Sequence, residues 1–147
     1  MNDGSLKEIG EFKTGGKGTG KISLVSGDVY TGKKMKGGQI ANCWVEVSAD
    51  GNTLWAANAL SSSITSYSIG HKGKLKMINE TAFKDSSEML FFSDLCLSSE
   101  GNYVYQLVGN KGAGIMFKVL PNGNLIKVSD FSSKKLPAVG TYGMTVL

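Results

Sequence analysis

Two carboxylates, Glu46 and Asp94, are the residues of this chain whose type and position best suit catalysis. Each belongs to a short apolar stretch that ends in a glycine-asparagine turn, CWVEVSADGN and SDLCLSSEGN. A carboxylate in a binding site can take a proton as a general base or bind a metal ion. It can equally be a rim residue that is held by hydrogen bonds, and the sequence leaves both interpretations open.

Four side-chain amides could bind a polar ligand near these carboxylates: Gln39, Asn42, Asn58 and Asn110. Other reactive groups are scarce, because the chain has one histidine, His71, and neither a GxSxG nor an HExxH motif. A histidine-rich metal site or a histidine-activated nucleophile would have to use His71, which lies in a turn pattern. We therefore predict no metal site and no cofactor.

The segment GGKGTGK, residues 15–21, comes close to a phosphate-binding loop. Such a loop ends in Ser or Thr and continues as a helix. Here Ile22 takes the Ser/Thr position, and the following residues ISLVSGDVY lack a helical pattern. Without a helix N-terminus the anion site loses its dipole and its amide donors. We interpret the segment as a flexible glycine-rich loop.

The charge of the chain argues against a nucleic-acid surface. Its net charge of +4 comes from 16 lysines against 12 acidic residues, and it contains no arginine, the residue that makes bidentate contacts to phosphate and guanine. No apolar run approaches the roughly 20 residues of a membrane span. The two cysteines, Cys43 and Cys96, fall on opposite faces of equivalent strands, so we predict two buried free thiols and no disulfide.

An internal repeat organises the chain. The stretch CWVEVSADGNTLWAAN, residues 43–58, aligns without a gap with SDLCLSSEGNYVYQLV, residues 93–108, so that Gly51 matches Gly101. Each copy has the pattern of an apolar strand, a tight turn and a second apolar strand. The pattern predicts two four-stranded units, with strands at 43–48, 53–58, 63–69 and 75–83 and at 93–98, 103–108, 113–119 and 125–131.

The second strands of both units, LWAA and VYQLV, are apolar on both faces, which predicts sheets that are covered on both sides. Four-stranded antiparallel units at this spacing are typical of β-propeller blades. We predict an all-β propeller segment that forms one domain over residues 1–147. Its parts are the outer strand of a preceding blade (1–12), a Gly/Lys-rich linker with weak strands at 21–25 and around 29–30 (13–42), two complete blades (43–83 and 93–131) and the inner strand of a closing blade (143–147).

The blade stretches CWVEVSADGNTLWAANALSSSITSYSI and SSEGNYVYQLVGNKGAGIMFKV resemble the repeat of the lactonase-type seven-bladed β-propeller family, with its 6-phosphogluconolactonase-like members and YVTN-type repeats. DGSLKEIGEF and NGNLIKV resemble its outer strand, and LPAVGTYGMTVL resembles its C-terminal tail. The resemblance implies that the chain is the C-terminal portion of a longer propeller. Gln106, Leu107 and the late asparagine at Asn110 depart from the family's pattern.

The resemblance implies a hydrolase that opens a sugar-derived lactone on the channel face, with Glu46 and Asp94 assisting the attack of water. The alternative is a non-catalytic propeller scaffold that binds a protein or a glycan. Expected partners are a small lactone or carbohydrate, and either the remaining blades or other copies of the chain, because two blades leave their outer faces exposed. We expect a soluble chain; a secreted or periplasmic parent fits, although the sequence leaves the compartment open.

Overall fold

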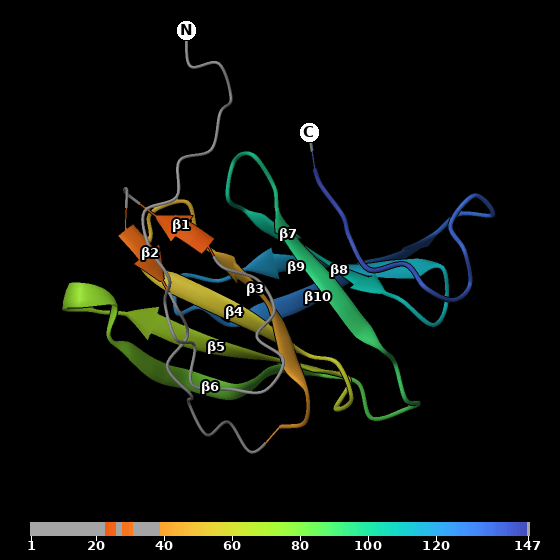
Figure 1. Cartoon of the computed structure of the whole chain (residues 1–147), viewed down its shortest axis with the longest axis horizontal. Helices are drawn as coiled ribbons and strands as arrows, with labels where there is room; N and C mark the ends of the chain where they lie inside the picture. The colour runs from red at the N-terminus through yellow and green to blue at the C-terminus, as the bar shows by residue number, and fades with distance from the viewer. Residues whose placement is uncertain (1–22, 26–27, 31–38, 147) are drawn as a thin grey trace, which may run out of the picture.

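The computed structural model describes residues 23–25, 28–30 and 39–146, and these residues form an all-β structure (Figure 1). Blade one is a four-stranded antiparallel sheet in the order β3-β4-β5-β6, and blade two is a second such sheet formed by β7 to β10. The strands of blade one are β3 (Asn42–Val47), β4 (Thr53–Asn58), β5 (Ser63–Ile69) and β6 (Leu75–Lys84). Those of blade two are β7 (Phe92–Leu97), β8 (Tyr103–Val108), β9 (Ala113–Val119) and β10 (Leu125–Ser132).

The first turn of each blade has the same geometry, as the internal repeat predicts. Gly51 and Gly101 both have a φ of +73°, a left-handed conformation that is costly for residues with a side chain. In blade one the amide of Ser48 donates to the carbonyl of Thr53 at 2.8 Å, and in blade two Ser98 repeats this bond at 2.8 Å. The repeated sequence therefore fixes the turn, and the turn fixes which residues of the following strand face the core.

The main core lies between the two blades, which stack face to face with β3 beside β7 (Figure 1). Blade one contributes Trp55, which is fully buried and donates its indole N–H to the carbonyl of Gly123 at 2.8 Å. The ring of Phe83 lies 4.6 Å from that of Phe117 and 6.2 Å from that of Phe92, measured between centroids. Stacked four-stranded sheets with apolar faces are the arrangement of propeller blades, so the predicted fold class is confirmed.

Several predicted boundaries and burial states need correction. Asn42 belongs to β3 and not to the linker, because it pairs with Asn58 across the sheet. Of the linker, the structure describes a short hairpin of β1 (Ser23–Val25) and β2 (Asp28–Tyr30), which agrees with the two weak strands predicted there. The outer strand predicted over 1–12 and the GGKGTGK loop lie outside the described residues.

Both cysteines are free thiols as predicted, but both are half-buried, and burial raises the pKa of the Cys43 thiol.

The C-terminal segment, residues 133–146, passes over the second blade after β10. The amide N–H of Gly140 in this segment donates to the carbonyl of Gly109. The hydroxyl of Ser93 on β7 donates to the carbonyl of Thr141 at 3.0 Å. Residues 143–146 are not part of a strand, so the inner strand expected there is not formed within the described chain. Its assignment to a closing blade stays a prediction, because a strand forms only beside a pairing partner.

Candidate functional site

The two predicted catalytic carboxylates lie on the strands at the inner edge of the blades, where β3 and β7 are neighbours. Glu46 pairs with Trp55 across the β3–β4 ladder, so its side chain shares the face of blade one that is turned toward blade two. The side chain of Asp94 lies on the opposite side of β7 from Leu95, which is part of the core between the blades. The structure therefore places the two carboxylates on different faces and does not bring them together as a pair.

Asp94 holds the C-terminal segment against β7. Its carboxylate is buried and accepts the amide N–H of Leu95 at 3.0 Å and that of Met144 at 3.0 Å. Glu46 is half-buried and accepts the amide N–H of Val47 at 3.2 Å. Both carboxylates thus hydrogen bond to backbone, which agrees with the structural alternative that the sequence left open, and their catalytic roles stay predictions.

Three of the four predicted ligand amides meet in one hydrogen-bonded network at the loop end of blade one. Asn58 is fully buried, accepts the side-chain N–H of Asn42 at 2.9 Å, and donates to the hydroxyls of Ser63 and Thr65, each at 3.0 Å. The carbonyl oxygen of the Gln39 side chain accepts from Ser63 at 2.9 Å. Since these amides bind each other and their neighbours, the network fixes the end of the sheet, and ligand binding by it stays a prediction.

The fourth amide, Asn110, lies apart from this network and fastens the segment that connects the blades. Its side-chain oxygen accepts the amide N–H of Phe91 at 2.9 Å, and its side-chain nitrogen donates to the carbonyl of Met89 at 3.1 Å. Asn110 is exposed. The repeat aligns Asn58 with Val108, so Asn110 is not its structural counterpart and makes contacts of its own.

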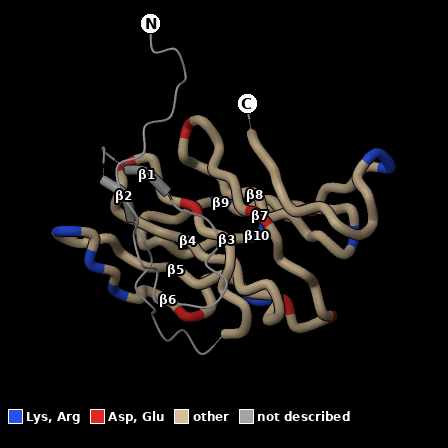
Figure 2. The backbone as a smooth tube through the Cα atoms, in the orientation of Figure 1, with Lys and Arg blue, Asp and Glu red and all other residues tan. Residues whose placement is uncertain are grey.

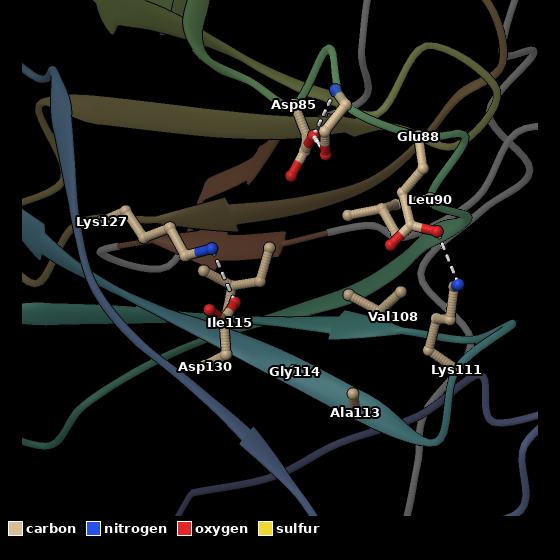
Figure 3. Close-up of a pocket in the computed structure, with 11 residues that line it drawn as sticks. Asp85, Glu88, Leu90, Val108, Lys111, Ala113, Gly114, Ile115, Lys127 and Asp130 are labelled. Carbon is tan, nitrogen blue, oxygen red and sulfur yellow. Dashed lines mark hydrogen bonds and ion pairs between the residues drawn. The ribbon is translucent and has the colours of Figure 1, made fainter.

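A cavity of about 330 Å³ opens between blade two and residues 85–91, the connector that joins β6 to β7, and we call it the connector cavity (Figure 3). Its floor is formed by the apolar side chains of Leu90, Val108 and Ile115, which are all buried. The volume falls within the range of about 300–1,000 Å³ that is usual for small-molecule sites. The remaining lining residues are small or charged: Asp85, Ser87, Glu88, Lys111, Ala113, Gly114, Lys127 and Asp130.

Two ion pairs stand on opposite sides of this cavity (Figure 3). Lys111 Nζ lies 2.6 Å from a carboxylate oxygen of Glu88, and Lys127 Nζ lies 2.8 Å from one of Asp130. The hydroxyl and amide of Ser87 donate to Asp85 and, together with the charge of Lys127, hold the pKa of its carboxyl below the ordinary value of 3.8. Asp85 is therefore ionised at neutral pH, and the cavity offers both ammonium donors and carboxylate acceptors over an apolar floor.

Lys111, Lys127 and Asp130 are site residues that the sequence interpretation missed. Lys127 and Asp130 lie on β10 at positions that pair with Phe117 and Ile115, so they share the face that is turned toward blade one. Charged residues on a strand face that is predicted to pack against a neighbouring blade are the signal that could have identified them. Lysines elsewhere are spread over turns and outer strands of the described part of the chain (Figure 2), as expected for a solvated surface.

The histidine of the chain lies in a turn, as the sequence pattern predicts. His71 is exposed in a short 3-10 turn, His71–Gly73, that joins β5 to β6. Over residues 39–146, no cluster of three or more His, Cys, Asp or Glu side chains is arranged to hold a metal ion. The described residues include no helix long and apolar enough to cross a membrane.

No family model matches the sequence, and no curated protein gives a significant match. Solved structures do match the fold. The chain is similar to the periplasmic gluconolactonase PpgL of Pseudomonas aeruginosa, with a TM-score of 0.56 and 22% identity over 63% of this chain and 27% of that protein. A candidate 6-phosphogluconolactonase of Bacteroides fragilis matches with a TM-score of 0.54 and 20% identity over 80% of this chain and 31% of that one. A Lactobacillus plantarum protein matches with a TM-score of 0.58 and 17% identity, covering 76% and 34%.

These similarities confirm the predicted likeness to lactonase-type propellers at the level of the fold. The identities are too low to carry an activity, a substrate or a catalytic residue from those proteins to this chain. The chain spans about a third of the length of the solved proteins that it matches. It therefore corresponds to a segment of a larger propeller in the structures with which it aligns.

Proposed function

We propose that the protein hydrolyses a sugar-derived lactone, and that the connector cavity is where this chain binds it. The observation that carries the proposal is the combination, in one cavity of about 330 Å³, of an apolar floor with ammonium and carboxylate groups on opposite sides. A sugar ring has a matching character, because its C–H face is apolar and its hydroxyls both donate and accept hydrogen bonds. The lactonase-like fold supports the same reaction class.

In the proposed reaction, the ammonium group of Lys127 donates a hydrogen bond to the carbonyl oxygen of the lactone. A water hydrogen-bonded to the Asp130 carboxylate attacks the carbonyl carbon, and the carboxylate takes its proton. Lys127 stabilises the negative charge on the tetrahedral intermediate. The bond to the ring oxygen then breaks, the ring oxygen recovers the proton from Asp130, and the product is an open-chain hydroxy acid. Its carboxylate can bind Lys111 on the other side of the cavity.

The proposal is tested by measuring hydrolysis of gluconolactone and of a simple valerolactone by the purified chain. We expect turnover above the buffer rate for the sugar lactone, and a decrease of about 10-fold to 100-fold in Lys127→Met, because the oxyanion loses its donor. Lys72→Met, in the exposed turn before β6, is the matched control and should retain full activity. A wild-type rate equal to that of buffer, or equal rates for the two lysine variants, would contradict the proposal.

A non-catalytic scaffold remains the second candidate, and the hydrogen bonding of the inner edge favours it. Asp94 and Asn58 are buried and bonded to groups of the chain itself, as residues that stabilise a fold are. The double variant Glu46→Gln with Asp94→Asn separates the assignments, because both substitutions preserve shape and remove the charges. If lactone turnover is unchanged in this variant, the catalytic prediction for these two residues is wrong.

A further inference from the structure

The charged groups around the connector cavity distinguish between classes of lactone. The lining residues include three carboxylates and two ammonium groups: Asp85, Glu88, Asp130, Lys111 and Lys127. These groups give the lining a net charge of −1 at neutral pH, although the whole chain carries +4. A negatively charged lining repels an anionic ligand and has no such effect on an uncharged one.

Both lysines of the cavity are already paired with carboxylates. Lys111 lies 2.6 Å from Glu88, and Lys127 lies 2.8 Å from Asp130. The two pairs stand on opposite sides of the cavity (Figure 3), so their ammonium groups do not converge on one point. A lysine that turned toward a bound phosphate would leave its own carboxylate without a partner in the same cavity. The exchange would therefore compensate no additional negative charge.

The other groups with which proteins commonly bind phosphate are also missing from this lining. The chain contains no arginine, whose guanidinium makes bidentate contacts to phosphate. The lining residues belong to strands, turns and loops, so no helix N-terminus points amide groups at the cavity. The hydroxyl and amide of Ser87 donate to Oδ1 of Asp85, at 2.5 and 2.8 Å. The donors of the lining are thus directed at its own carboxylates.

The same lining suits a ring that carries hydroxyl groups. A carboxylate can accept about four hydrogen bonds. Asp85 accepts two from Ser87, both at one oxygen, and retains capacity to accept a bond from a sugar hydroxyl. The buried floor of Leu90, Val108 and Ile115 offers an apolar surface to the C–H side of the ring.

We propose that the connector cavity selects an uncharged lactone, whose ring carries hydroxyl groups but no phosphate group. The inference rests on the proposed function, because it concerns the substrate of the same cavity. The single carboxylate of the open-chain product can take the place of Glu88 beside Lys111. A phosphate ester instead brings a charge of about −1.5 to −2 at pH 7, which the lining does not compensate.

The test compares two ligands that share one ring, 1,5-anhydroglucitol and its 6-phosphate. Neither ligand is a lactone, so binding is measured separately from turnover. The dissociation constants come from amide NMR titrations of the full chain at about 0.15 M salt, where charges act over about 8 Å. We expect the phosphate ester to bind about 5-fold to 10-fold more weakly than the uncharged ring.

The salt dependence gives a second readout with a definite sign. Raising the salt to about 1 M shortens the Debye length to about 3 Å. The affinity for the phosphate ester should then increase, because its repulsion by the lining is screened, and the affinity for the uncharged ring should stay the same. A phosphate that is bound by the lysines would instead lose affinity as the salt concentration rises.

A charge-matched pair of variants locates the effect in the cavity. Glu88→Gln removes one carboxylate and releases Lys111, so it should bind the phosphate ester at least about 5-fold more tightly than the wild type and the uncharged ring equally well. Glu100→Gln removes the same charge from an exposed turn between β7 and β8 and should bind both ligands like the wild type.

Tighter binding of the phosphate ester than of the uncharged ring, with shifts at residues 111 and 127, would contradict the selection for an uncharged lactone and leave the lactone site in place. No shift at the cavity residues with either ligand would contradict both this inference and the proposed function. Equal effects of Glu88→Gln and Glu100→Gln would mean that the charge of the whole chain controls binding, and would also overturn the inference.

Discussion

Blade one and blade two share their strand order, the lengths of their first three strands and their first turn, but they differ in what surrounds them. Both faces of blade one are packed, so that its second strand, β4, is buried along nearly its whole length. In blade two, the same strand, β8, leaves Tyr103 and Tyr105 half-exposed. The comparison shows that the repeat determines the backbone of a blade, whereas the residues on its faces have adapted to different neighbours.

The ends of the two blades show a similar divergence in polar contacts. Blade one has a buried hydrogen-bonded network around Asn58, whereas blade two has the buried apolar Val108 at that position of the repeat. The exposed Asn110 binds the segment between the blades. Blade two also has a buried glutamine, Gln106, where blade one has Ala56. Its side-chain nitrogen donates to the carbonyls of Ser93 and Asp94, at a bulge in β7. The motif departures noted in the sequence are thus the places where blade two differs structurally.

The largest expected effect comes from the aromatic residue at the centre of each blade. Trp55→Ala should lower the free energy of unfolding by about 3 to 5 kcal/mol, because it opens a cavity and loses the bond to Gly123. Tyr105→Ala should cost at most about 1 kcal/mol in the monomer, since its ring is half-exposed. Urea unfolding followed by circular dichroism measures both. Equal losses of free energy of unfolding would mean that Tyr105 is packed as tightly as Trp55.

The amides at the blade ends should rank second. Asn58→Ala removes three hydrogen bonds from a buried site and should cost about 2 to 3 kcal/mol. Asn110→Ala removes two bonds from an exposed residue and should cost about 1 kcal/mol or less. The same unfolding assay compares them. If Asn110→Ala lowers the free energy of unfolding more than Asn58→Ala does, the contacts of Asn110 with the segment between the blades stabilise the fold more than the network of blade one.

Gln106→Ala gives blade two the residue that blade one has. The variant should lower the free energy of unfolding by about 1 to 2 kcal/mol, because the carbonyls of Ser93 and Asp94 lose their donor. The loss is moderate because the variant also removes a buried side-chain oxygen that lacks a hydrogen-bond partner. Hydrogen exchange should show faster exchange at the amide of Met144, which Asp94 binds. An unchanged exchange rate there would mean that Gln106 does not position Asp94.

The smallest difference between the blades is expected at the shared turns, where the two blades should respond alike. Gly51→Ala and Gly101→Ala each force alanine into a φ of +73°, at a cost of about 1 to 2 kcal/mol. Thermal unfolding of the two variants gives the comparison. A difference much larger than this cost would show that the two turns have different structural roles, although their sequences and geometry agree.

Much of the fold could be predicted because the same pattern of strands and turns occurs in both copies of the repeat. The predicted ranges 53–58, 63–69, 103–108 and 113–119 coincide with β4, β5, β8 and β9. The other four blade strands differ from prediction by one residue, at both ends for β3 and β7 and at the C-terminal end for β6 and β10, where turn and strand residues are chemically alike. The exposure of Cys43 and Cys96 was predicted wrongly, because burial depends on neighbours that the repeat does not specify.

The candidate site was predicted only in part. Gln39, Asn42 and Asn58 do meet, but the sequence could not show that they would bind one another. The connector cavity was missed because Lys111 lies in the turn between β8 and β9, far in sequence from Lys127 and Asp130 on β10, and the three follow no short motif. They line one cavity with residues 85–90 only because that segment packs against blade two, which no local pattern records.

The most direct test of the proposed site is an amide NMR titration of the full chain with gluconate, the open-chain product of gluconolactone hydrolysis. We expect shifts for residues 85–90, 113–115 and 127–130, which line or flank the connector cavity, and we expect these shifts to be lost in Lys127→Met. Lys72→Met should bind gluconate like the wild type. Shifts confined to β3 and β7 near Glu46 and Asp94, or no shifts up to the solubility limit of gluconate, would contradict the assignment of the site to this cavity.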